Sequence, residues 1–398
     1  MMSPQTLKGG QTITLEETGQ TPTEPAKTPI RITRGFRKPS HKTATAIFWI
    51  TFAVVAVVAG IGIVVQDMRF VMAAIYFAMG FVFQRAGFCS ASLLSAAVLS
   101  RDMRGLRAIL VAVLTAMLGF GLMDILGWVT IYPGRISVIP AAVAGIIFGI
   151  GMVLAGGCIS GSLFKATEGH LPSIIAVAGI FAGLAAGLSP WGRGGIEFLT
   201  GLSESWKIPS NIVDPFGDAF ALMAVGIALI GLSAMCLIYR RRILDSPLKN
   251  AYPVSGSWPL FGVAVIVGLL GWAAIVVGPS LGRTHPLGAS HMPYSLLKYV
   301  FDGDVRIVGL IAWTFVLGSA LSAWLRGKLI WRTAPKGMLV LAFFGGVLVG
   351  FGAILGGGCF VGQILSGWAL LSIHALIFGI TMILANWITT LLYLRGWR

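Results

Sequence analysis

The chain has 398 residues, of which 56% are hydrophobic and only 11% are charged. This composition excludes an ordinary soluble domain and is typical of a polytopic membrane protein. A net charge of +15 would suggest nucleic-acid binding in a soluble protein. Here the Lys and Arg residues cluster between apolar runs, so we expect cytoplasmic loops and no nucleic-acid partner.

Residues 1–42 are polar and rich in Thr, Pro and basic side chains, which predicts a disordered cytoplasmic tail. They lack the apolar core of a signal peptide. Seven basic residues precede the first apolar run, so the N-terminus is expected inside. The rest, 43–398, is predicted to be one membrane transporter domain with pseudo-repeat halves at about 70–192 and 257–395.

The first half contains interrupted spans. Two uncharged pieces, 70–84 and 86–100, flank Arg85, and each has 15 residues, fewer than the roughly 20 that cross a bilayer. We therefore expect a tilted span followed by a re-entrant half-helix that begins near Cys89. Residues 138–164 form a second apolar run with a glycine break. Residues 193–218 are expected to connect the halves on the outside.

About nine full crossings are predicted, together with several re-entrant pieces. Residues 282–294 are expected to be irregular because of their prolines. The basic C-terminus, with Arg395 and Arg398, is expected inside. The remaining spans are expected at residues 43–65, 108–129, 171–192, 219–239, 258–278, 307–325, 338–355 and within 370–394.

Four cysteines sit singly in apolar runs, without a CxxC pair. Three of them, Cys89, Cys158 and Cys359, follow glycine-rich segments that break a helix. In lipid, irregular backbone is tolerated only where protein buries it or a cavity hydrates it, so these breaks are expected to line a site. Cys236 has no glycine cluster beside it, and we interpret it as a small hydrophobic side chain.

The glycine-cysteine breaks belong to an internal repeat. Aligning Cys158 with Cys359, 201 residues later, places 141–163 over 342–364, and nine of the 23 positions are identical, six of them glycine. Aligning Cys89 with Cys158, an offset of 69, gives a weaker match on the same feature.

Charge bias gives the two copies opposite orientations. The span before Cys158 is expected to run from outside to inside, and the span before Cys359 from the inside loop that ends at Lys336. Inverted repeats with broken helices are typical of transporters. A fourth copy is expected near residues 282–288, without a cysteine.

The predicted fold class is thus an all-α polytopic membrane protein with inverted structural repeats, about nine transmembrane helices and short re-entrant helices. Within the repeat, two Gly-x3-Gly motifs are interpreted as sites of close helix packing. Their glycines are Gly145, Gly149, Gly346 and Gly350.

Three single cysteines in glycine-rich breaks, spaced by 69 and then 201 residues, resemble the YeeE/YedE family over residues 43–395. This resemblance implies a helical bundle with inverted halves in the bacterial inner membrane. It implies uptake of thiosulfate along a path lined by Cys89, Cys158 and Cys359. It also implies a small sulfur-carrier protein as a cytoplasmic partner and, for longer members, a link to selenium compounds.

Thiols suit such a substrate. Thiosulfate is a dianion with one soft, polarisable sulfur, and a thiol offers a weak S–H donor and a polarisable surface. The N-termini of half-helices can stabilise the negative charge of the anion without binding it too tightly for release. We expect Cys158 and Cys359 to face each other across the narrowest part of the path, with Cys89 at a different depth.

Other polar residues are weaker candidates for the lining. Arg85 can attract an anion or snorkel to the interface, and the second interpretation is preferred. Lys165 can face the exit or act only as a positive-inside residue, which is preferred. Gln363 shares a helix face with the thiol four residues before it, and a helix–helix hydrogen bond is equally expected. His285 and His374 are interpreted as structural.

We predict a transporter rather than an enzyme, with no catalytic residue, metal or cofactor. The alternative is a membrane-embedded sulfurtransferase or thiol-redox protein that uses Cys158 or Cys359 as a nucleophile. A soft-metal pathway is a third hypothesis, since thiolates suit Cu(I), but no Met-x-x-Met or His-rich segment supports it.

Overall fold

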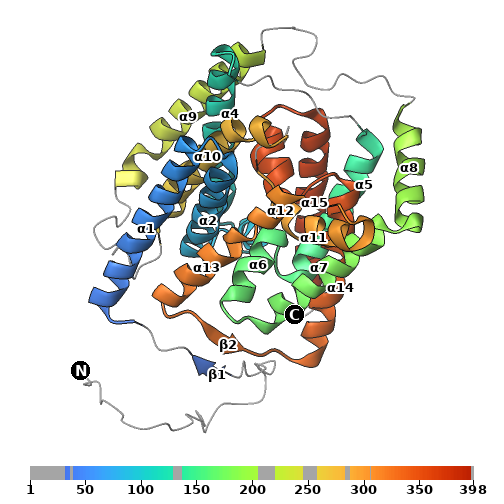
Figure 1. Cartoon of the computed structure of the whole chain (residues 1–398). Coiled ribbons are helices and arrows are strands. Elements are labelled where there is room, and N and C mark those ends of the chain that lie inside the picture. The colour runs from blue at the N-terminus through green and yellow to red at the C-terminus, as the bar shows by residue number, and fades with distance from the viewer. Residues whose placement is uncertain are drawn as a thin grey trace.

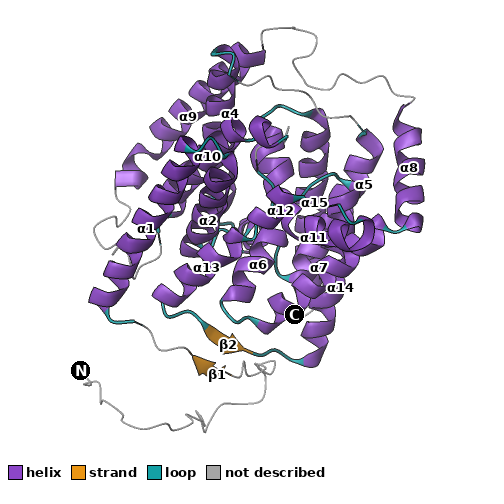
Figure 2. Ribbon diagram, in the orientation of Figure 1, coloured by secondary structure: helices purple, strands orange, loops and turns teal. Residues whose placement is uncertain are grey.

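The computed structural model describes residues 32–35, 39–128, 137–204, 220–244, 258–282, 287–304 and 306–395. Helices make up most of this part of the chain (Figures 1 and 2). Within it, nine helices are long and apolar enough to cross a membrane. The chain is therefore a multi-pass, all-α membrane protein, and the predicted fold class is confirmed.

The first half contains eight helices, and the predicted interruptions at residues 87–89 and 156–158 are confirmed as breaks between consecutive helices. The helices are α1 (His41–Val64), α2 (Met68–Ala86), α3 (Ser90–Leu99), α4 (Arg104–Ile125), α5 (Val138–Ala155), α6 (Ile159–Thr167), α7 (Leu171–Leu188) and α8 (Pro190–Glu204).

The second half repeats the pattern of a long helix followed by a break and a short helix. Its helices are α9 (Phe220–Leu244), α10 (Leu260–Val277), η3 (Pro279–Leu281), α11 (His291–Asp302), α12 (Ile307–Ile311), α13 (Thr314–Leu325), α14 (Lys336–Leu355), the π-helix η4 (Val361–Trp368) and α15 (Ile373–Arg395).

A small antiparallel ribbon lies at one end of the bundle, where β1 (Ile32–Gly35) pairs with β2 (Ile330–Arg332) (Figure 2). Strand β1 falls inside the segment 1–42 that was predicted to be a disordered tail, whereas residues 1–31 lie outside the described part. Backbone hydrogen bonds from β2 to Glu168 and Gly169 tie the ribbon to the loop between α6 and α7. We call this end the hairpin face.

Helices α8 and α11 occupy segments that were expected to be a connection and an irregular loop. Neither is apolar enough throughout to form a span, since α8 carries Arg193 and Glu197 and α11 carries Lys298 and Asp302. Their mixed polar and apolar character is what a search for uninterrupted apolar runs misses. The rest of the predicted loops, 205–219 and 283–286 with His285, lie outside the described residues.

The two halves contact each other through equivalent residues of α5 and α14. A side-chain carbon at Gly151 of α5 would lie 2.8 Å from the Val349 nitrogen of α14, and one at Gly352 of α14 would lie 3.1 Å from the Phe148 nitrogen of α5. These are equivalent pairs under the 201-residue offset. Because higher numbers on α5 meet lower numbers on α14, the two helices are antiparallel. The repeat is therefore inverted, as transporters commonly show.

The Gly-x3-Gly motifs also pack equivalent pairs of helices, one motif in each half. Added side-chain carbons at Gly145 and Gly149 of α5 would collide with backbone carbonyls of α15. Those at Gly346 and Gly350 of α14 would collide with backbone carbonyls of α7. Each helix pair comes too close for any side chain, so the predicted packing role is confirmed.

Candidate functional site

The helix breaks before the three motif cysteines share one backbone conformation. Gly87, Gly156 and Gly357 have φ of 62°, 67° and 66°, and each lies two residues before a motif cysteine. This left-handed region favours glycine, which explains why the breaks require it. After the glycine, the chain turns so that Cys89 and Cys158 become the N-cap residues of α3 and α6.

The two Gly-Gly-Cys breaks lie at opposite ends of the α5–α14 crossing. A side-chain carbon at Gly345 would meet Leu154 and Ala155, next to the first break, whereas one at Gly356 would meet Ala144 at 3.0 Å. Gly345 and Gly356 are about 16 Å apart along a helix with a rise of 1.5 Å per residue. Because α14 leaves β2 and runs away from it, Cys359 lies further from the hairpin face than Gly345 does.

Cys158 is accompanied by Cys89. A side-chain carbon at Gly161 of α6 would lie 2.7 Å from the Cys89 Sγ and 3.5 Å from the Cys158 Sγ, and both thiols are buried. We predicted Cys89 at a different depth and Cys158 facing Cys359. The structure instead places Cys89 beside Cys158, because the residue that begins α3 lies against Gly161 in the first turn of α6. We call Cys89 and Cys158 the thiol pair.

Several hydroxyl groups surround the thiol pair. The Ser160 Oγ lies 3.2 Å from the Cys158 Sγ, which also accepts a hydrogen bond of 3.4 Å from the Gly161 nitrogen. Ser90 is buried and interacts with the Cys158 thiol. Ser162 is also buried, and within the described part of the chain its hydroxyl has no hydrogen-bond partner, which is unusual for a buried hydroxyl group.

Lys165 reaches back toward the break that precedes its own helix. Its Nζ donates to the Gly156 carbonyl at 2.6 Å and to the Ser92 hydroxyl at 3.4 Å. The ammonium group therefore supports the left-handed turn before Cys158. Lys165 therefore makes structural hydrogen bonds, and is more than a positive-inside residue of a cytoplasmic loop.

The second break is supported by different side chains. The Gln363 amide donates to the Gly356 carbonyl at 2.5 Å, and the His374 Nε2 lies 2.9 Å from the same oxygen. Gln363 thus bonds within its own break rather than to another helix. The structural role expected for His374 agrees with this contact. Cys359 is 1% exposed behind this turn.

Arg85 is fully buried, so the snorkelling interpretation is wrong. Its guanidinium lies over the Phe81 ring, 5.1 Å from the centroid, which is a cation–π contact. Arg326 donates to the carbonyl oxygens of Gln84 and Arg85, both at 3.0 Å, and so caps α2. Arg326 itself is only partly buried.

A polar cluster between the thiol pair and the hairpin face was missed by the sequence reasoning. The Gln84 amide donates to the Glu168 carboxylate at 2.8 Å and accepts from the Ser322 hydroxyl at 2.6 Å. Burial, and then the charges of Lys165 and Arg332, lower the pKa of His170 below its ordinary 6.5. His170 is therefore neutral at pH 7. Only the fold brings these helices together, so no sequence pattern could have identified the cluster.

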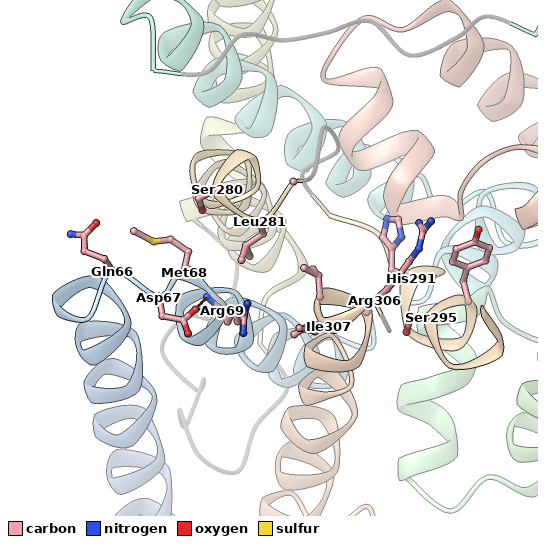
Figure 3. Close-up of a pocket in the computed structure, with 14 residues that line it drawn as sticks. Gln66, Asp67, Met68, Arg69, Ser280, Leu281, His291, Ser295, Arg306 and Ile307 are labelled. Atoms are coloured by element: carbon pink, nitrogen blue, oxygen red, sulfur yellow. Dashed lines mark hydrogen bonds and ion pairs between the residues drawn. The ribbon is translucent and has the colours of Figure 1, made fainter. Parts of the chain in front are cut away.

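Two cavities open at the other end of the molecule, of about 970 Å³ and 370 Å³. They share the walls formed by His291, Tyr294 and Arg306. Figure 3 shows His291 and Arg306 on one side of the larger cavity and Gln66 on the opposite side. We call this end the cavity face.

The smaller cavity reaches the second break, because Gly357 and Gly358 line it together with Ser290. Its rim carries two arginines, Arg193 and Arg306.

Both rim arginines are paired with aspartates. Arg193 lies 3.6 Å from Asp302, and Arg306 lies 3.2 Å from Asp304. These exposed pairs contribute little to stability, but they hold the guanidinium groups at the cavity rim. Among our sequence candidates, only the Cys359 break is placed at this cavity. Arg193, Arg306 and Ser290 were not singled out, since isolated polar residues near span ends carry no motif.

Comparisons with known proteins identify the family of this chain. A family model described as "Sulphur transport" matches residues 85–388. The chain is 27% identical to "Thiosulfate transporter TsuA" of Escherichia coli (strain K12) over 336 residues, which cover 80% of this chain and 93% of that protein. It is 23% identical over 325 residues to the protein of the same name from Spirochaeta thermophila (strain ATCC 700085 / DSM 6578 / Z-1203), covering 78% and 94%.

Proposed function

Because the chain belongs to the sulphur-transport family, as the YeeE/YedE resemblance indicated, we propose that it imports thiosulfate or a closely related sulfur or selenium oxyanion. The names of its relatives in two bacteria support this substrate. The observation that carries the proposed path is the thiol pair at Gly161. It lies beyond the break at Cys359, and the smaller cavity leads to that break.

The path would run from the cavity face past Cys359 to the thiol pair, and then past Lys165 to the hairpin face. Each thiol offers a polarisable surface and a weak donor to the terminal sulfur of thiosulfate. Successive weak sites let an anion bind and also leave. The depth difference between the two breaks supplies two such stages.

The negative charge of the bound anion would be stabilised by backbone dipoles more than by charged side chains. Short helix α6 begins at Cys158, and its first amides have no partner one turn earlier in the helix. Amides of this kind favour an anion through the positive end of the helix dipole. The two arginines at the rim are paired with aspartates, and Glu197 also lines the smaller cavity, so the rim adds little net positive charge. Lys165 would supply one cation beyond the thiol pair.

We infer that the hairpin face is cytoplasmic and that the protein resides in the inner membrane. The basic loop between α13 and α14 lies at this face, as the positive-inside rule requires of a cytoplasmic loop. A small sulfur-carrier protein would then receive the anion at the hairpin face.

Uptake of labelled thiosulfate by whole cells tests the proposal. We expect Cys359→Ala, Cys158→Ala and Cys89→Ala each to lower uptake roughly tenfold, since each loses a donor to a charged group. Cys236→Ala is the matched control, because Cys236 is exposed on α9. Sulfate, sulfite, selenite and tetrathionate as competitors would define the substrate. Uptake that does not depend on the three motif cysteines would refute the path.

A second candidate function is sulfur transfer, and the closeness of Cys89 and Cys158 favours it. A thiolate would attack the terminal sulfur of thiosulfate, forming a cysteine persulfide and releasing sulfite, so that one S–S bond forms as another breaks. Purified protein that releases sulfite from thiosulfate, with no uptake into proteoliposomes, would support this function. Uptake of intact thiosulfate without sulfite supports transport.

A further inference from the structure

The internal repeat identifies a fourth position that is equivalent to those of the three motif cysteines. The 201-residue offset that aligns Cys158 with Cys359 also aligns Gly87-Phe88-Cys89 with Gly288-Ala289-Ser290. The counterpart of Cys89 is therefore Ser290. We expected the fourth copy at 282–288, and this register places it at the end of that range and just beyond.

Ser290 occupies the position at the start of its helix that Cys89 occupies in the first half, although the backbone differs. Cys89 is extended, with φ −101° and ψ 110°, whereas Ser290 is helical, with φ −66° and ψ −23°. Ser290 is the N-cap residue of α11, as Cys89 is of α3. Gly161 lies against Cys89, and its counterpart Gly362 lies against the segment before Ser290. A side-chain carbon at Gly362 would be 3.7 Å from the Leu287 carbonyl and 4.0 Å from the Gly288 Cα.

Two hydrogen bonds hold this segment from neighbouring helices. The Tyr76 hydroxyl donates to the Gly288 carbonyl at 3.4 Å, and the Ser366 hydroxyl donates to the Leu287 carbonyl at 3.2 Å. The backbone before Ser290 is thus anchored to both α2 and η4. The position of the serine follows from tertiary contacts and not from a flexible loop.

Ser290 is a buried residue, and its hydroxyl makes no capping bond. The residue is 8% exposed, and its side chain forms no hydrogen bond to the start of α11. It lines the 370 Å³ cavity together with Gly357 and Gly358, whose chain continues into Cys359. A buried donor that its own helix leaves unused, at the wall of a cavity, is available to a ligand.

We propose that Ser290 is the oxygen-binding member of the substrate site, placed by the repeat near Cys359 as Cys89 is placed beside Cys158. This inference rests on the proposed function. The Ser290 hydroxyl would donate to an oxygen of thiosulfate, and the Cys359 thiol would contact its terminal sulfur. Such a mixed pair recognises both ends of the anion, whereas the two thiols of Cys89 and Cys158 offer their polarisable surfaces to its soft end. Sulfate lacks the soft end and would bind only the hydroxyl.

Uptake of labelled thiosulfate by proteoliposomes that contain the full chain tests Ser290. We expect Ser290→Ala to raise the KM for thiosulfate roughly tenfold, because one hydrogen bond to an anion is lost. Ser290→Thr keeps the hydroxyl and is expected to retain a KM within about twofold of the wild type. In the wild type, sulfate is expected to compete weakly, and its inhibition constant should rise in Ser290→Ala by the same factor.

Ser319→Ala is the matched control. Ser319 is a fully buried serine of α13 whose hydroxyl donates to the Val316 carbonyl of its own helix, and it lines neither cavity described above. Its KM should match the wild type. A Ser290→Ala protein with wild-type KM overturns the inference while the proposed function stands. Wild-type protein that takes up no thiosulfate overturns the proposed function itself.

If Ser290→Ala does not reach the membrane, Ser290→Cys decides the question. It keeps the shape of the side chain with a slightly larger atom and offers a weaker donor, so we expect a KM roughly threefold above the wild type. A KM equal to the wild type would show that the hydroxyl is not used.

Discussion

At the scale of single residues, the candidate site depends on side chains that support its breaks. Lys165 donates to the carbonyl of Gly156, and Gln363 donates to the carbonyl of Gly356. The two supports differ in charge. Among the described residues, an ammonium group bonds to the break before Cys158, whereas an amide and an imidazole contact the break before Cys359. The thiol pair and Cys359 therefore present different fields to an anion. Lys165 would favour the anion at the stage nearer the hairpin face.

Substituting Lys165 tests this role. We expect Lys165→Met to lower thiosulfate uptake roughly tenfold, since a hydrogen bond from a charged donor and the local positive charge are both lost. Lys165→Arg should retain part of the activity. Uptake assays would compare these variants with Lys336→Met, which removes an exposed cation at the start of α14 on the same face. Equal effects of the Lys165 and Lys336 substitutions would leave Lys165 with only a topological role.

At the scale of helices, small residues bring the two halves together. Glycines of α5 contact α15, and their counterparts on α14 contact α7, so each half contributes one helix to the other's packing. Van der Waals contact at such short distances is the main attraction between helices in lipid. The breaks extend directly from these two tightly packed helices, and so their positions are rigidly coupled to the interface between the halves.

Gly346→Ala tests this packing. A methyl group there would collide with the Ala176 carbonyl, so the two helices must separate. We expect a loss of about 1–3 kcal/mol in stability, measured as a lower Tm in detergent. Gly226→Ala in α9 is the control, because a side-chain carbon at Gly226 would meet nothing within 4 Å. That variant should keep or raise its Tm through better helix propensity. A Tm of Gly346→Ala equal to the wild type would contradict the packing argument.

At the scale of the whole molecule, the two ends differ in shape and chemistry. The hairpin face carries the ribbon and the loop between α6 and α7, and the cavity face carries two cavities that share one wall. In an inverted repeat, each half presents its break toward a different end. One break therefore serves the cavity face and the other lies nearer the hairpin face.

Labelling in intact cells tests which face is outside. Ser280→Cys on the cavity face is expected to react with a membrane-impermeant maleimide added to whole cells. Lys328→Cys on the hairpin face should react only after the membrane is permeabilised. Both positions are exposed. The reverse pattern would show that the positive-inside argument assigns the wrong orientation.

The sequence by itself determined the breaks, the repeat, its inversion and most of the spans; the helix at the predicted span 219–239 is not among the nine long apolar helices of the described residues. Each depends on local composition or on charge between spans, and the glycine at each break is required by a local left-handed turn. It also identified the three cysteines. It did not identify α8 and α11, whose mixed polarity hides them in a search for apolar runs.

Only the tertiary structure decided which residues lie together. The depth of a break depends on how α5 and α14 cross, and no local pattern encodes that crossing. Cys89 therefore lies beside Cys158, and Arg85 is buried against Phe81 rather than at an interface. The 201-residue offset pairs Ser290 with Cys89 in the sequence, but only the structure shows that Ser290 lines the cavity that reaches the Cys359 break.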